Sequence, residues 1–322
     1  MSLEQLARAA GSSARSALSQ ERTQAGRTRH PSLQRKRHLV AWAFMLPFLM
    51  VSVFVVLGPS LSSFYYSLTD WSGLGAAHFI GLANFQHLLI DTDFRKAILY
   101  NLFWMAWFLT IPMGLGLFGA FLLSQIKRFQ LFFRAAYFVP YIIASVINAA
   151  IWEQILDPQQ GLAFELDKIG IHWLDNLYFF GDQHLALPSV AFVDSWHFWG
   201  FLLVFFLAAM QSVDKDLYDA ARVDGANRWN QFWHITLPGI LPVFGILVLL
   251  VTVWSLITFE YPYIITQGGP AGATQILTVL LYQDAFANNE AGYAAAMGIV
   301  ISFLAITITL IYQYLQRKGL EI

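Results

Sequence analysis

Six long apolar stretches constrain this chain more than any other feature of its sequence. A helix needs about 20 predominantly apolar residues to cross a hydrocarbon core of about 30 Å. Backbone hydrogen bonds cannot be left open in lipid, so we expect each stretch to form one spanning helix. The sequence therefore predicts an all-α membrane protein with six transmembrane helices. The stretches lie at roughly 39–60, 98–123, 133–155, 188–210, 240–263 and 292–315.

The composition supports a membrane protein and excludes cysteine chemistry. Hydrophobic residues make up 57% of the chain and charged residues only 12%. A soluble domain has about 25% charged residues, because its surface faces water. With no Cys in the sequence, there is no disulfide framework, thiolate metal site or Cys nucleophile. Prolines inside the stretches predict kinks supported by neighbouring helices. These are Pro47, Pro59, Pro112, Pro140 and Pro242.

Lysine and arginine set the expected orientation. Of the 19 in the chain, all but Arg95, Lys96 and Lys168 lie in the termini or in the loops after the second and fourth stretches. The positive-inside rule places those segments, including 214–238, in the cytoplasm. The opposite orientation is the alternative. We expect three parts: a basic, disordered cytoplasmic tail at 1–38, a transmembrane domain at 39–316, and a short cytoplasmic tail at 317–322.

The polar segment 214–238 lies between the fourth and fifth stretches and predicts an elbow of two short helices. Ser212 or Asp214 can cap the first helix through a side-chain oxygen. Gly225 stands where a helix ends in a left-handed residue. Residues 226–235 predict a second helix capped by Asn227. We expect Pro238, the last residue of the segment, to separate that helix from the fifth span.

The side chains of the elbow suit docking onto another protein. Small residues allow close backbone approach, and two carboxylates can bind a partner. The alternative is an ordinary interfacial elbow whose aromatic residues, Trp229, Phe232 and Trp233, sit at the lipid headgroups. The residue chemistry leaves both interpretations open. The docking candidates are Asp219, Ala220, Ala221, Asp224, Gly225, Ala226, Phe232 and Pro238.

The order of these residues resembles the cytoplasmic Glu-Ala-Ala loop of importer-type ABC permeases, which grips the ATPase subunit. The pattern reads Asp219-Ala220-Ala221, Asp224-Gly225-Ala226, Phe232 and Ile235-Thr236-Leu237-Pro238. Asp219 replaces the usual glutamate, which keeps the charge and shortens its reach by one methylene.

Other segments resemble the carbohydrate branch of the same superfamily, and the resemblance covers roughly 38–320. It implies a type I ABC importer permease fold, similar to the maltose, trehalose and glycerol-phosphate permeases. The segments are Phe79-Ile80-Gly81-Leu82-Ala83-Asn84-Phe85, Phe133-Arg134 with Pro140, Thr266-Gln267-Gly268-Gly269-Pro270 with Thr274, and Gly292-Tyr293-Ala294-Ala295-Ala296.

The resemblance also implies partners and a location. They are a second permease subunit, homologous but different, two ATP-binding subunits, an extracytoplasmic solute-binding protein and a prokaryotic inner membrane. Gly268, Gly269 and Pro270 are candidates for contact with the binding protein. The chain has no Gly-x-x-x-x-Gly-Lys-Ser/Thr loop, so we expect a non-catalytic subunit whose ATPase partners use ATP and Mg. We expect no cofactor in this chain and no nucleic-acid partner.

Three carboxylates near the outer ends of spans are candidates for the solute pathway: Glu153, Asp194 and Glu260. An ionisable group inside the membrane costs about 2.5–3.5 kcal/mol on insertion scales and is a functional candidate. Carboxylates bind sugar hydroxyls, and aromatic faces stack on sugar C–H surfaces. Interfacial snorkelling or interhelical hydrogen bonds are the alternatives, and the aromatics can belong to an interfacial belt. The nearby aromatic candidates are Trp152, Trp196, Trp254 and Tyr261.

Two other classes of membrane protein and one glycine motif fit the sequence less well. An ion-coupled secondary transporter usually has deep acids and an internal repeat, whereas these acids lie near span ends and we find no convincing repeat. A membrane enzyme would need a nucleophile or metal constellation, and the histidines show no metal-ligand spacing. Gly114, Gly116 and Gly119 match a dinucleotide fingerprint but lie inside a span, where small residues predict helix packing.

Overall fold

The computed structural model describes residues 31–126, 128–172 and 177–318. The chain divides into two compact units, up to Ser62 and from Ser63 onward. The first unit holds α2 (Pro31–Val51), the π-helical turn η1 (Ser52–Leu57) and the start of α3 (Gly58–Tyr66). The basic tail was expected to be disordered through residue 38, but α2 already begins at Pro31. The rest of that tail, 1–30, lies outside the described residues.

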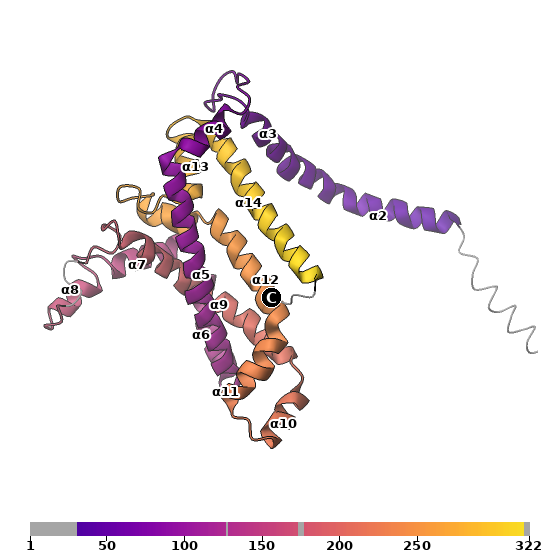
Figure 1. Cartoon of the computed structure of the whole chain (residues 1–322), viewed down its shortest axis with the longest axis vertical. Helices are drawn as coiled ribbons and strands as arrows, with labels where there is room; N and C mark the ends of the chain where they lie inside the picture. The colour runs from indigo at the N-terminus through magenta and orange to yellow at the C-terminus, as the bar shows by residue number, and fades with distance from the viewer. Residues whose placement is uncertain (1–30, 127, 173–176, 319–322) are drawn as a thin grey trace, which may run out of the picture. The chain divides into compact units, whose positions relative to one another are not determined.

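The second unit is a helical bundle (Figure 1). Five helices of the described chain are long and apolar enough to cross a membrane, and a bent pair of helices supplies a sixth span if counted as one. The expected all-α architecture with six spans is therefore confirmed, with one break. The elements are α4 (Ala83–Ile90), α5 (Thr92–Ser124), α6 (Gln130–Ile142), α7 (Ser145–Ile155), α8 (Leu162–Asp167), α9 (Ala186–Ser212), α10 (Lys215–Val223), α11 (Arg228–Gln231), η2 (Phe232–Thr236), α12 (Leu237–Ile257), η3 (Pro262–Thr266), α13 (Leu277–Phe286) and α14 (Ala291–Arg317).

The third expected span, 133–155, is not one helix. α6 and α7 meet at an angle of 95°, and Ile143 and Ala144 between them have extended backbone. The prediction of a single helix was wrong at this point. Pro140 lies in the last turn of α6 and removes one backbone donor there, which weakens the helix where it ends.

α9 lies at the centre of the larger hydrophobic core and packs against α5, α6 and α12. A Cβ atom added at Gly116 of α5 would lie 2.7 Å from the Leu202 Cβ, and one at Gly119 would lie 2.6 Å from the Leu203 Cδ1. Glycine therefore lets α5 and α9 approach closely, as small residues do in membrane helices. The expected packing role of this motif is confirmed for these two glycines.

A second core joins α4, α5, α13 and α14, and α13 was not anticipated from the sequence. The buried side chain of Asn101 links this core to α12. Its Nδ2 donates to the Ser255 carbonyl at 2.7 Å, and its Oδ1 accepts from the Leu277 N–H at 2.7 Å. One amide thus satisfies a carbonyl near the end of α12 and an N–H at the start of α13, groups that helix ends leave open.

The first turns of α5 and α14 lie at the end of this unit opposite α10 (Figure 1), and Asp91 ties the two helices together there. Its carboxylate caps α5 by accepting from the Asp93 N–H at 2.8 Å and accepts from the Tyr293 hydroxyl at 2.5 Å. Burial opposes ionisation, but these hydrogen bonds outweigh it and hold the pKa of Asp91 below its usual value.

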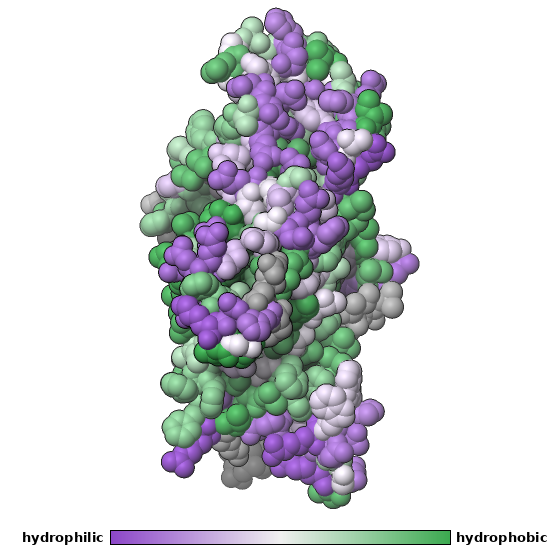
Figure 2. Space-filling view, turned by 90° about the vertical axis from the view of Figure 1, so that its left-hand side faces the viewer, coloured by the Kyte–Doolittle hydropathy of each residue, from purple (hydrophilic) through white to green (hydrophobic). Residues whose placement is uncertain are grey.

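The surface matches a membrane protein. On the face shown in Figure 2, hydrophilic residues are dense toward the two ends, and hydrophobic residues cover much of the surface between them, apart from hydrophilic patches at mid-height. Lipid-facing surface excludes charge, whereas the ends face headgroups and water.

Candidate functional site

The elbow at 214–238 begins with a capped helix, as the sequence predicted. The Asp214 carboxylate accepts from the Asp216 N–H at 3.0 Å, whereas the Ser212 hydroxyl donates back to the Ala209 carbonyl at 2.7 Å. Asp214 is therefore the cap of α10. The helix ends before Gly225, whose φ of +78° lies in the left-handed region, where residues other than glycine are strained.

The second half of the elbow differs from its prediction at one point. Asn227 caps α11 by accepting from the Asn230 N–H at 2.8 Å, as expected. Pro238, however, does not separate this helix from the fifth span, because α11, the π-helical turn η2 and α12 follow one another without a break. Pro238 lies in the first turn of α12, just after the π-helical turn η2, and local π-helical backbone is one way in which a continuous membrane helix accommodates a proline that has no N–H. The elbow thus continues directly into the span.

Aromatic packing fixes the elbow to the bundle. The Phe232 side chain is 6% exposed, and its ring centroid lies 4.8 Å from that of Phe121 at the end of α5. Trp229 packs on the same pair. The Tyr218 hydroxyl of α10 lies 2.9 Å from the Thr236 hydroxyl. A force on α10 or α11 is therefore transmitted to α5 and α12.

The outer face of the elbow carries small residues and is accessible to a partner. Five of the docking candidates, Asp219, Ala220, Asp224, Gly225 and Pro238, are exposed, while Ala221 and Ala226 are half-buried. No heavy atom lies within 4 Å of the position that a Cβ would occupy at Gly225. This face therefore offers two carboxylates and close backbone access to a partner, while Phe232 serves the interior.

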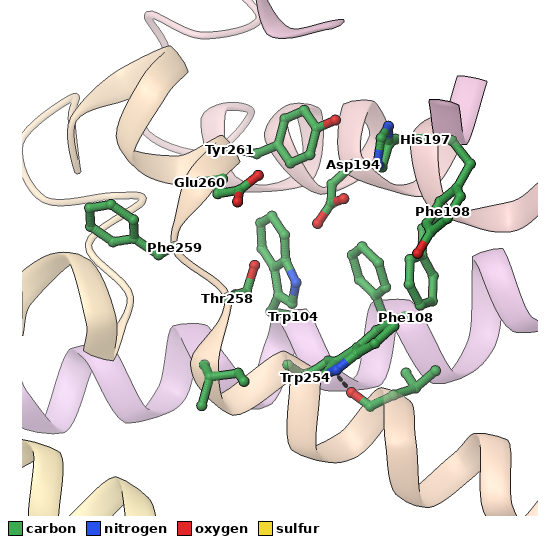
Figure 3. Close-up of a pocket in the computed structure, with 14 residues that line it drawn as sticks. Trp104, Phe108, Asp194, His197, Phe198, Trp254, Thr258, Phe259, Glu260 and Tyr261 are labelled. Carbon is green, nitrogen blue, oxygen red and sulfur yellow. Dashed lines mark hydrogen bonds between the residues drawn. The ribbon is translucent and has the colours of Figure 1, made fainter. Parts of the chain in front are cut away.

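A cavity of about 470 Å³ lies among α5, α6, α9 and α12, above the elbow in the bundle. Figure 3 shows the carboxyl groups of Asp194 and Glu260 pointing into the same space, beside the Trp104 indole. A pocket of this volume suits a small-molecule ligand. Its lining residues are Trp104, Phe108, Tyr141, Asp194, His197, Phe198, Val251, Trp254, Ser255, Ile257, Thr258, Phe259, Glu260 and Tyr261.

Irregular backbone forms one wall of this cavity. α12 ends at Ile257, and Thr258 and Phe259 are not helical. Non-helical backbone at membrane depth is tolerated where it is buried or lines a cavity. The Thr258 carbonyl accepts a hydrogen bond from the Thr278 hydroxyl. Next to it, the Tyr261 hydroxyl accepts from the Asn148 Nδ2 at 2.8 Å, which ties this wall to α7 beyond the break in the third span.

Aromatic rings make up most of the remaining wall. The Trp104 and Phe108 rings of α5 are stacked with centroids 5.4 Å apart. Trp254 of α12 meets Phe198 of α9 edge to face at 5.1 Å. Such rings present apolar faces to a ligand, while the two carboxyl groups accept hydrogen bonds. The combination suits a polyhydroxylated molecule with apolar C–H faces.

The structure separates the seven pathway candidates into two groups. Asp194, Trp254, Glu260 and Tyr261 line the cavity, whereas the other three do not. Trp152 and Trp196 pack on each other edge to face at 5.6 Å, and Glu153 lies beside Trp152 in α7. Trp104 and His197 line the cavity but were not among the candidates. A histidine inside the apolar fourth stretch was the one available signal.

The segment Gly268-Gly269-Pro270 forms a compact loop after η3. Gly268 has a φ of +88°. The Thr274 hydroxyl lies 2.6 Å from the Thr266 hydroxyl and donates to the Gly269 carbonyl at 2.9 Å. The loop therefore has a defined shape, and contact with a binding protein stays a prediction.

These features define a multi-pass membrane protein. It has spanning helices, a ligand-sized cavity among them that holds two carboxyl groups, and an exposed elbow. The family of binding-protein-dependent transport system inner membrane components matches residues 39–319, and the chain belongs to that family. This confirms the resemblance drawn from the elbow.

Relatives support the same assignment. A probable ABC transporter permease of Pyrococcus horikoshii is 32% identical over 281 residues, which cover 86% of this chain and 96% of the relative. A probable starch degradation products permease of Thermoanaerobacterium thermosulfurigenes is 31% identical over 278 residues, with 86% and 94% covered. A bacterial ABC transporter that imports alginate shares the fold with a TM-score of 0.78, at 24% identity and 88% and 96% coverage. The expected ABC importer permease fold is confirmed.

Proposed function

We propose that this chain is one of two permease subunits of an ATP-driven, binding-protein-dependent importer of a sugar or sugar-like solute. The observation that carries the proposal is the exposed elbow, which the Phe232 cluster joins to α5 and which runs without a break into α12. The carboxyl groups and aromatic walls of the cavity, together with relatives named for starch degradation products, support a sugar as the solute.

The partners and orientation belong to the same proposal. The elbow and both termini face the cytoplasm, where two ATP-binding subunits use ATP and Mg. A homologous but different permease supplies the other half of the pathway, and an extracytoplasmic binding protein delivers the solute near Gly268, Gly269 and Pro270. The transmembrane domain spans 39–316, and the chain itself is not catalytic. A prokaryotic cytoplasmic membrane is the expected location.

The mechanism is alternating access. Closure of the ATP-binding subunits moves the elbow, and its aromatic anchor carries the motion to α5 while the continuous helix carries it to α12. Both helices line the cavity, so their movement changes which side of the membrane the cavity opens to. Asp194 and Glu260 hold solute hydroxyls while access switches.

A mild-detergent purification of the tagged chain from its host, followed by mass spectrometry, tests the proposal. We expect an ATP-binding subunit and a second permease to co-purify. Recovery of the chain alone, with uptake in vesicles driven by an ion gradient, would contradict it and favour a secondary transporter.

A further inference from the structure

The charged groups of the cavity wall indicate which class of solute the importer carries. The resemblance covers permeases for neutral sugars and for a phosphate ester, so it does not decide whether the solute is neutral or anionic. The wall holds two carboxyl groups, Asp194 and Glu260, one imidazole, His197, and neither lysine nor arginine. In the described part of the chain, neither carboxyl group has a hydrogen bond or an ion pair.

Lysine and arginine are also rare in the surrounding spans. The sequence has no lysine or arginine between Lys168 and Lys215 or between Arg228 and Arg317. These intervals contain α9, α12 and α13 entirely. In α5 both basic residues fall within the first turn and a half, and Arg134 of α6 does not line the cavity. An anion entering the cavity therefore meets no lysine or arginine of this subunit, and the basic group among the lining residues is the His197 imidazole.

We propose that this cavity selects solutes by charge: it accepts neutral or amine-bearing sugars and rejects sugar acids and sugar phosphates. The inference rests on the proposed function and names the solute class for it. Hydroxyl and ammonium groups donate hydrogen bonds to a carboxyl group, whereas a carboxylate or phosphate can only accept them from it. Whether ionised or protonated, neither Asp194 nor Glu260 supplies the positive charge that a buried anion requires.

Intrinsic fluorescence tests the proposal directly, because Trp104 and Trp254 line the cavity. The full chain, with the subunits that co-purify, is placed in lipid nanodiscs and titrated with glucose, glucosamine and glucuronate at matched ionic strength. We expect glucose and glucosamine to quench the tryptophan fluorescence, and glucuronate to bind at least about tenfold more weakly, since like-charge contacts disfavour association. Equal affinity for glucuronate, or no response to glucose and glucosamine, would overturn the proposal.

Variants locate the selectivity. Asp194→Asn and Glu260→Gln should reduce the difference between glucose and glucuronate, and Trp254→Phe should reduce the amplitude of quenching. Glu165→Gln, on exposed α8, is the matched control and should leave both unchanged. Unaltered selectivity in both acid variants would contradict the assignment. If glucuronate binds well while ATP-binding subunits still co-purify, the charge selection fails and the importer assignment stands.

Discussion

The elbow and the cavity are built in opposite ways. The elbow is formed by the consecutive residues 214–238, with caps and a left-handed glycine that act within a few positions of each other. The cavity brings together side chains from Trp104 to Tyr261 on four spans. A site made by local structure is visible as a pattern in the sequence, whereas a site made by packing requires the fold. The two regions should therefore respond differently to mutation.

The largest effect is expected at the tip of the elbow. Gly225→Asp places a side chain at a φ of +78°, which costs about 1–2 kcal/mol, and adds a carboxylate to the docking face. The added carboxylate obstructs close approach of the ATP-binding subunit, and we expect solute-stimulated ATP hydrolysis and uptake to fall at least about tenfold, because a loss of about 1.4 kcal/mol in docking free energy is a factor of ten. The matched control is Gly75→Asp, with a φ of +76° and the same open surroundings, which should transport normally. Wild-type uptake by Gly225→Asp would contradict the docking role.

Next comes the anchor of the elbow. Phe232→Ala removes a buried ring from the Phe121 cluster, and such truncations cost about 3–5 kcal/mol. We expect a lower thermal midpoint of the purified chain and weaker retention of the ATP-binding subunit. Trp233→Ala, at a side chain that is 49% exposed, should cost less than about 1 kcal/mol. Equal losses in the two variants would show that the anchor is not specific.

A smaller effect is expected where packing shapes the cavity. A Cβ at Gly200 of α9 would overlap the backbone of Tyr137 on α6. Gly200→Ala should therefore force the two helices apart, at a cost of about 1–3 kcal/mol, and weaken quenching by glucose. Gly114→Ala, where nothing lies within 4 Å, is the matched control. An unchanged thermal midpoint and unchanged quenching in Gly200→Ala would contradict close α6–α9 packing.

The smallest effect is expected from one hydrogen bond in the wall. Tyr261→Phe removes the acceptor of the Asn148 amide, which is buried. We expect a loss of about 1 kcal/mol in stability, measured by thermal unfolding, with little change in ATP-binding subunit retention. Tyr178→Phe, at a side chain that is 54% exposed, should have no measurable effect. Weaker retention of the ATP-binding subunit by Tyr261→Phe would contradict the separation of the two regions.

Features of the elbow and the spans could be predicted from the sequence where they depend on local structure. Apolar length located every span, and Asp214, Gly225 and Asn227 were readable because caps and left-handed residues act locally. A kink at Pro140 was expected, but the complete break between α6 and α7 and the continuation through Pro238 were not. A proline signals a local weakness, and the tertiary packing decides whether the helix breaks, bends or goes on.

The cavity was only half visible in the sequence. Asp194 and Glu260 stood out because a carboxyl group in an apolar stretch is costly. Trp104 and Phe108 did not stand out. Aromatic residues make up 16% of the chain, so a single ring does not distinguish a cavity position from any other. Glu153 looked equivalent to the other two acids, but α7 turns by 95° from α6 and Glu153 does not line the cavity.

Site-specific photo-crosslinking at the elbow shows whether the segment 214–238 contacts an ATP-binding subunit. The chain has no cysteine, so Ala220→Cys carries a maleimide–benzophenone probe at a single exposed site of the docking face. Ala76→Cys, exposed in the loop that precedes α4, is the control. We predict that the Ala220 probe crosslinks to an ATP-binding subunit in native membranes and that the Ala76 probe does not. Crosslinking of the Ala220 probe to lipid alone would contradict the account and make the segment an ordinary interfacial elbow.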